Sequence, residues 1–266
     1  MALALLLVPL PWRHAVANVN ATGQWHETQR TSSAGLSATH RGGDFAACGQ
    51  RLKPTSRTVP AAAILGASYT AGVGPDNSSL AWSALLAREL GWDAVIYGDS
   101  GAGYVSAGGG DHGPVLRMLA RIGLRTFDPS LVVLQFGHDD IGVPAAIERR
   151  AVERTIAAIR AQDPRARVAL LTVFAMPGTH PAAWRTDRAI VSAARTADPH
   201  AIIIDPLARH WVYPRAHHGL HPSAAGDRRI ARNVYDILRA HGIRSARPGA
   251  GRMICDSPRA RPASAR

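Results

Sequence analysis

The chain has 266 residues, which suffices for one large domain or two small ones whose core needs no disulfide or metal on grounds of size. Apolar residues make up 46% and charged residues 19%, so a disordered or fibrous protein is excluded. The net charge of +12 comes mostly from residues 1–60 and 244–266, so a central domain that recognises specific nucleic acid is excluded as well.

The chain begins with a segment typical of a secretory signal. Ala2–Leu10 is an apolar run, and Ala15-Val16-Ala17 fits the small-x-small cleavage pattern. No basic residue precedes the run, so the alternatives are a start codon further upstream, an unusual leader, or an apolar tail without a targeting role. A spanning helix needs about 20 apolar residues, and this run is too short to cross a membrane. We predict a signal peptide over 1–17 and a secreted or cell-surface protein, with a cytoplasmic location as the alternative.

The segments that flank the central region are polar. Residues 18–58 are predicted to be a loosely ordered extension, and residues 244–266 a basic disordered tail. Both ends are expected to contact anionic surfaces such as cell-wall polymers. Cys48 and Cys255 lie outside the central region and either form a disulfide in an oxidising compartment or remain two bystander thiols.

Residues 59–243 alternate short apolar runs with amphipathic patterns. The runs predict buried strands over Ala61–Leu65, Ala94–Tyr97, Leu131–Phe136, Val168–Phe174 and Ala201–Ile204. Helical spacing predicts helices over Leu80–Leu90, Val115–Leu124, Ala145–Ala161, Ala182–Ala197 and Ser223–Ala240. Apolar strands that alternate with helices indicate an α/β domain with a parallel sheet covered on both faces. Ligand sites in such sheets lie beyond the carboxyl ends of the strands.

Three loops at those strand ends carry candidate chemistry. Ser68 follows the first strand among glycines and presents its hydroxyl and backbone N–H to a ligand, or else lies in an ordinary turn. It is not a G-x-S-x-G elbow, because Thr70 stands two residues later. The glycine-rich loop after the second strand offers backbone donors. Asp139 and Asp140, after the third strand, either bind a cation, cap a helix or take part in catalysis.

Histidines precede the last predicted helix. His221 lies directly before Pro222, which holds it at the helix start, and His217 and His218 lie nearby. The three histidines have the composition of a metal site, but no cysteine accompanies them, so we expect neither a metal nor a cofactor.

Together these four segments resemble the SGNH (GDSL) hydrolase family. The resemblance rests on Gly-x-Ser-Tyr-Thr at residues 66–70, the Ser-Gly loop at 100–101, Gly-x-x-Asp at 137–140 and His-Pro at 221–222, and it spans about residues 61–242. It implies a flavodoxin-like three-layer α/β/α sandwich with a five-stranded parallel sheet, in agreement with the strand count.

The resemblance also implies roles for individual residues. Ser68 would be the nucleophile and, with its own N–H, one oxyanion donor; Gly101 would be a second donor. Asp139 takes the place of an asparagine, the third donor of the family. His221 matches the general base, whereas His218 replaces the aspartate of the triad. Tyr69, Tyr104 and Trp211 either line the substrate pocket or are ordinary packing residues.

Asp139 and His218 differ from the family pattern, and both differences affect catalysis. An ionised Asp139 donates nothing and repels an oxyanion, whereas loss of a single donor already costs about 10²–10³ in rate. Asp139 is expected to function only if its pKa is high enough to keep it protonated. Loss of the triad aspartate costs about 10⁴ in turnover, unless a neutral His218, a backbone carbonyl or Asp205 orients His221 instead.

The sequence therefore favours a serine-dependent carboxyl-ester hydrolase that acts on a small-molecule or glycan ester. The resemblance implies esterase, lipase or carbohydrate O-deacetylase activity through an acyl-enzyme on Ser68. The alternative is a catalytically degenerate protein of the same fold that binds acylated glycans or cell-wall polymer.

Overall fold

The computed structural model describes residues 59–75, 78–109, 113–174, 176, 179–217, 219–247, 250–251 and 253–255. The expected signal peptide (1–17), the extension (18–58), Cys48 and His218 lie outside the described residues. The signal peptide and the Cys48–Cys255 disulfide therefore stay predictions. Within the described part, no helix has the length and apolar character that a membrane crossing requires.

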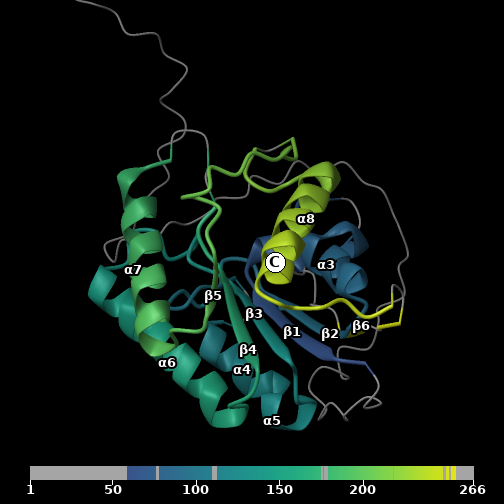
Figure 1. Cartoon of the computed structure of the whole chain (residues 1–266). Helices are drawn as coiled ribbons and strands as arrows, with labels where there is room; N and C mark the ends of the chain where they lie inside the picture. The colour runs from purple at the N-terminus through teal and green to yellow at the C-terminus, as the bar shows by residue number, and fades with distance from the viewer. Residues whose placement is uncertain are drawn as a thin grey trace, which may run out of the picture. The chain divides into compact units, whose positions relative to one another are not determined.

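A parallel sheet forms the centre of the described domain (Figure 1). Its strands run in the order β5-β4-β3-β1-β2-β6. Their bounds are Ala61–Gly66 (β1), Asp93–Gly98 (β2), Leu131–Gln135 (β3), Arg167–Leu171 (β4), Ile202–Ile204 (β5) and Met253–Cys255 (β6). The five predicted strands and the α/β class are confirmed. The apolar run at Thr172–Phe174 continues past β4 as buried loop, so burial rather than strand pairing explains its composition.

The sixth strand corrects the expectation for residues 244–266. Met253–Cys255 forms β6, which pairs in parallel with β2 at the sheet edge, so this part of the predicted disordered tail is ordered. Ala246 N–H also donates to the carbonyl of Leu90 at 2.8 Å. A three-residue strand gives no usable periodicity, and its partner lies far away in sequence.

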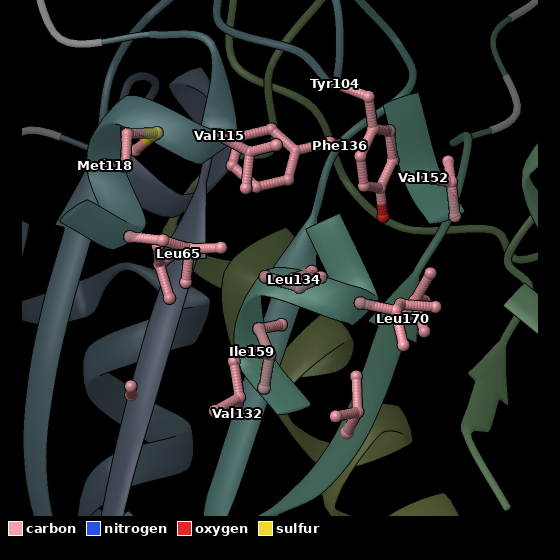
Figure 2. Close-up of a cluster of buried hydrophobic side chains, with 14 of the residues drawn as sticks. Leu65, Tyr104, Val115, Met118, Val132, Leu134, Phe136, Val152, Ile159 and Leu170 are labelled. Carbon is pink, nitrogen blue, oxygen red and sulfur yellow. The ribbon is translucent and has the colours of Figure 1, made fainter. Parts of the chain in front are cut away.

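Helices cover both faces of the sheet (Figure 1). One face packs against α4, α6 and α7, and the other against α3 and α8. The bounds are Ser68–Ala71 (α2), Trp82–Leu90 (α3), Val115–Ile122 (α4), Leu124–Phe127 (α5), Ala145–Gln162 (α6), Pro181–Ala197 (α7) and Ala224–Ala240 (α8), with a 3₁₀ turn at Ser78–Leu80. Alternate residues of β1 enter the two cores: Leu65 packs toward α4 (Figure 2), and Ile64 packs toward α3 and α8. This alternation is what a strand buried on both faces requires.

A buried carboxyl group connects α3 to α8. Asp227, in the first turn of α8, accepts a hydrogen bond from the backbone N–H of Trp82 at 2.9 Å, which satisfies a donor at the start of α3. Ala81, at the N-cap of α3, supplies no such side-chain acceptor. The second oxygen of Asp227 has no hydrogen-bond partner among the described residues. Burial raises the pKa of Asp227 from 3.8 to about 8.

This arrangement predicts how stability changes with pH. Because the folded-state pKa lies above the unfolded value, the contribution of Asp227 is fully present below about pH 4 and is lost as pH rises through about 8. Asp227→Asn keeps an oxygen for Trp82 but cannot ionise. We expect it to be more stable than the wild type by a few kcal/mol at about pH 9, with the difference vanishing near pH 4. Thermal unfolding of both proteins across this range tests it; a difference that does not change with pH contradicts it.

Candidate active site

Ser68 lies at the junction between β1 and the short helix α2. It is the first residue of α2, so its backbone N–H has no acceptor within the helix. The turn into α2 is tight, because a Cβ on Gly66 would lie 2.1 Å from Thr70 Oγ1. Only glycine therefore fits at position 66. The sequence predicts no helix here, because four residues are too few to show a periodic pattern.

Gln135, the last residue of β3, holds this turn in place. Its side-chain oxygen accepts hydrogen bonds from Thr70 Oγ1 at 2.8 Å and from Thr70 N–H at 3.2 Å, and its carbonyl accepts one from Ala67 N–H at 3.2 Å. Gln135 is fully buried. Gln135 belongs to none of the predicted site motifs, although a polar residue within an otherwise apolar run is a visible signal.

The structure brings Ser68 and His221 together. His221 Nε2 lies 2.8 Å from Ser68 Oγ, and both side chains are buried. The loop that carries His221 folds back on itself: Ala216 N–H donates to the carbonyl of His221 at 2.9 Å, and Ser223 N–H donates to that of Pro214 at 3.0 Å. Ser223 then caps α8 through Gly226 N–H. The imidazole is thus fixed by a hairpin on one side and a helix start on the other.

Asp140 organises the loop after β2. Its carboxylate accepts hydrogen bonds from the backbone N–H groups of Tyr104 at 2.7 Å, Val105 at 3.2 Å and Ser106 at 2.9 Å. Burial raises the pKa of Asp140, while these hydrogen bonds act in the opposite direction. A Cβ on Gly103 would lie 2.2 Å from the carboxylate oxygens, so the loop approaches Asp140 too closely for any other residue.

Gly101 and Asp139 therefore belong to two loops that are fastened together. Gly101 has a φ of +79°, in the loop that Asp140 holds. Ser106 Oγ donates to the carbonyl of Asp139 at 2.8 Å. The pair Asp139–Asp140 thus binds the two loops together, and neither the cation nor the helix-cap interpretation describes what Asp140 does.

Glu148, in the first turn of α6, is a second buried acid close to Asp140. It is fully buried, and neither carboxyl oxygen has a hydrogen-bond partner in the described part of the chain. Burial and the charge of Asp140 raise the pKa of Glu148 to about 9. Glu148 is therefore neutral at pH 7 and adds no negative charge beside the carboxyl group of Asp140.

Aromatic side chains lie around the Ser68–His221 contact. Tyr69 is buried, stacks on Phe174 with ring centroids 4.5 Å apart, and lies 5.4 Å from the ring of His221. Its hydroxyl donates to the carbonyl of Leu220 at 2.7 Å and lies 3.2 Å from the hydroxyl of Tyr213. Burial raises the pKa of Tyr69, so its phenol stays neutral. Trp211 is half-buried and packs edge-on against Phe174.

Tyr104 corrects the expectation that it lines the pocket. Its side chain is buried in the core between the sheet and α6, where it lies edge-on to Phe136 with centroids 5.5 Å apart (Figure 2). Tyr104 contributes to the site through its backbone N–H, which donates a hydrogen bond to Asp140, and not through its ring.

Asp205 does not replace the missing aspartate. Its carboxyl group shares a hydrogen bond with Asp187 of α7 and accepts one from Ala208 N–H at 2.8 Å. Burial raises the pKa of Asp187 to about 6. His218, the other side chain considered as a partner of His221, lies outside the described residues. Within the described part, no three His, Cys, Asp or Glu side chains gather as metal ligands do.

Comparison with known proteins shows the family to which this sequence belongs. Residues 64–229, more than half of the chain, match the model of the GDSL-like lipase/acylhydrolase family. No curated protein matches the sequence.

Several solved structures share the fold. A carbohydrate esterase family 2 enzyme with a carbohydrate-binding domain from Corynascus thermopiles (Myceliophthora fergusii) is 20% identical, with a TM-score of 0.55 over 72% of this chain and 68% of that one. TesA is 24% identical, with a TM-score of 0.55 over 68% of this chain and 99% of that one. A carbohydrate esterase whose active site has divergent catalytic and non-catalytic binding functions is 18% identical, with a TM-score of 0.54 over 69% and 70% of the two chains.

The role of Asp140 is open to a direct test of stability. In Asp140→Asn, one of the two carboxylate oxygens becomes an NH₂ group that faces a backbone N–H. We expect a loss of about 1–3 kcal/mol in the free energy of unfolding, measured with urea. Asp236→Asn is the matched control, because Asp236 is exposed and its surface ion pair with Arg232 is worth about 0.5 kcal/mol or less. Equal losses in the two variants contradict the role assigned to Asp140.

Proposed function

Because the chain belongs to the GDSL-like lipase/acylhydrolase family, we propose that it is a serine-dependent carboxyl-ester hydrolase in which Ser68 is the nucleophile and His221 the general base. The observation that carries this proposal is the 2.8 Å contact between Ser68 Oγ and His221 Nε2 across 153 residues of sequence. A nucleophile and a base within hydrogen-bond distance are what acyl transfer requires.

The reaction follows from this contact. Ser68 Oγ attacks the ester carbonyl carbon while its proton passes to His221 Nε2. The resulting tetrahedral intermediate collapses, the bond to the alcohol oxygen breaks, and His221 returns the proton to that oxygen. Water then attacks the acyl-enzyme with His221 again as base, which releases the acid and restores the Ser68 hydroxyl.

The oxyanion donors are the backbone N–H of Ser68 and that of Gly101. The first belongs to a helix start and the second to the loop that Asp140 holds. Donors fixed in this way need no reorganisation when charge develops on the carbonyl oxygen, which is where their value in catalysis lies. Asp139 completes this group as a donor only when protonated.

The substrate class comes from the family and from the structural relatives. We propose short acyl esters, including O-acetyl groups on carbohydrates, or lipid esters. Carbohydrate esterases among the relatives favour the glycan ester, and the half-buried ring of Trp211, which packs against Phe174, suits contact with a sugar. We further propose that the protein acts outside the cell or at its surface, where the basic ends contact anionic polymers.

Loss of the nucleophile is the first test of the mechanism. We expect Ser68→Ala to abolish hydrolysis of p-nitrophenyl acetate, a fall of about 10³-fold or more, because no acyl-enzyme can form. A fluorophosphonate probe should label the wild type at Ser68 and fail to label the variant. The control is Ser192→Ala, which removes an exposed hydroxyl from α7. Equal rates for Ser68→Ala and the wild type rule out the serine mechanism.

A second test concerns Asp139. In Asp139→Asn, an amide N–H replaces a carboxylate next to the developing oxyanion. If Asp139 is ionised at the working pH, we expect kcat to rise about 10²-fold or more, since a repulsive charge is removed and a donor is gained. If Asp139 is protonated, the variant should match the wild type at low pH and exceed it only above the pKa of Asp139. A fall in kcat at every pH assigns Asp139 some role other than an oxyanion donor.

The alternative function is non-catalytic binding of acylated glycans or cell-wall polymer. Asp139 in place of a neutral donor favours it, and one structural relative is itself described as having both catalytic and non-catalytic binding functions. Retention of acetylated xylan by the wild type and Ser68→Ala alike, with no acetate released, supports this alternative.

A further inference from the structure

A groove along α7 is lined by residues outside the Ser68–His221 site. Its volume is about 620 Å³, and side chains of α7 line it together with Asp205 and Ala208, from the segment after β5. The α7 side chains recur at the three- and four-residue spacing of one helix face, from Trp184 to Thr196. Such a stretch of helix is about 18 Å long, so this α7 groove is elongated along the helix axis.

Trp184 supplies an aromatic surface in the α7 groove. Its side chain is half-buried: part of it packs against the core between the sheet and α7, and part lines the groove. The ring of His210 lies edge-on to it, with centroids 6.5 Å apart, which limits the movement of the indole. A rigid indole is a surface on which the C–H groups of a sugar ring pack well.

Two carboxyl groups lie together in the wall of the groove. Asp187 is only 2% exposed, accepts a hydrogen bond from the backbone N–H of Val173 at 3.4 Å, and shares another with Asp205. Ala208 N–H donates to Asp205 at 2.8 Å, so both carboxyl groups are held in place. Burial raises the pKa of Asp187 to about 6, and its carboxyl group is therefore largely ionised at pH 7 and accepts hydrogen bonds.

Two arginines balance the negative charge of these acids. Arg188 and Arg195 are exposed and line the same groove, so two guanidinium groups accompany two carboxyl groups. A strongly charged ligand of either sign meets like charges there. A hydroxyl group both donates and accepts hydrogen bonds, so a neutral polyol uses the arginine donors and the aspartate acceptors alike.

We propose that the α7 groove is a second, non-catalytic binding site for a neutral, β-1,4-linked oligosaccharide, in which Trp184 packs against a sugar ring and the charged side chains bind its hydroxyl groups. A concave surface with an aromatic lining and a few fixed polar groups is the usual form of a small-ligand site. Because the groove follows a helix, an extended β-1,4-linked chain fits it better than an α-1,4-linked chain, which coils. The inference does not depend on ester hydrolysis, since no lining residue takes part in the proposed reaction.

Calorimetric titration with unacetylated hexasaccharides tests the site without turnover, because these probes contain no ester. Xylohexaose and cellohexaose are the β-1,4-linked probes, and maltohexaose is the α-1,4-linked control. We expect at least one β-linked probe to bind the wild type with a Kd of about 1 mM or tighter, and maltohexaose to bind about tenfold more weakly or not at all. Because the ligand is uncharged, added salt should change its affinity little.

Paired tryptophan variants assign the binding to the groove. Trp184→Ala should weaken the binding of the β-linked probe about tenfold or more, because it removes the packing surface. Trp211→Ala is the matched control, since Trp211 is also half-buried but packs against Phe174 in the aromatic group around the Ser68–His221 contact. This variant should keep the wild-type affinity.

A pair of arginine variants tests the polar contacts at positions where folding is not at risk. Arg188→Ala should weaken binding about threefold or more, because it removes hydrogen-bond donors from the groove. Arg228→Ala, which removes an exposed arginine from α8, is the control and should bind as the wild type does. Thermal unfolding shows whether each variant is folded, and Arg188→Ala decides the test should Trp184→Ala fail to fold.

Three results overturn the proposal. They are no binding of either β-linked probe up to about 10 mM, equal binding of maltohexaose, and binding that Trp184→Ala and Arg188→Ala leave unchanged. If that unchanged binding is lost in Trp211→Ala, the glycan lies at the catalytic pair instead. Failure of the proposed function is recognised separately, because the wild type and Ser68→Ala would then hydrolyse p-nitrophenyl acetate at equal rates while the hexasaccharide titration stays the same.

Discussion

All strands of the sheet run in the same direction, and the rest of the structure depends on this constraint. The loops after β1, β2 and β3 leave at one common edge, and Ser68, Gly101 and Asp139 belong to these three loops. His221 then needs only to reach this edge from the start of α8, and it does so at 2.8 Å from Ser68 Oγ. Parallel pairing of the strands places these residues at one edge of the sheet. The conformations of the loops then set the directions in which their functional groups point.

Buried polar groups supply that adjustment. Gln135 holds the turn that presents Ser68, and Asp140 holds the loop that contains Gly101. Hydrogen bonds at low dielectric are strong and directional, so such groups fix a loop more rigidly than apolar packing does. The cost is desolvation, visible in the raised pKa values of Asp140 and Glu148. Because Glu148 is neutral at pH 7, it adds no charge that would repel the carboxyl group of Asp140.

The sequence predicts those parts of the fold that local patterns encode. Five strands, the helices between them and the order of the loops follow from apolar runs and helical spacing. The short helix at Ser68–Ala71 and the edge strand Met253–Cys255 do not, because too few residues form them to show a period. The ring of Tyr104 looked available for substrate and is instead buried against Phe136, since its exposure depends on α6, which packs over it only in the folded chain.

The same distinction applies within the candidate site. Ser68 and His221 stand out in the sequence because their neighbours form a recognisable pattern. Asp140 and Gln135 hold their loops through partners that are distant in sequence, and no pattern shows which partners these are. Charge shows the difference most clearly. Asp139 departs from the family pattern and is visible in the sequence, whereas the neutral state of Glu148 follows from its burial close to Asp140, which only the folded chain shows.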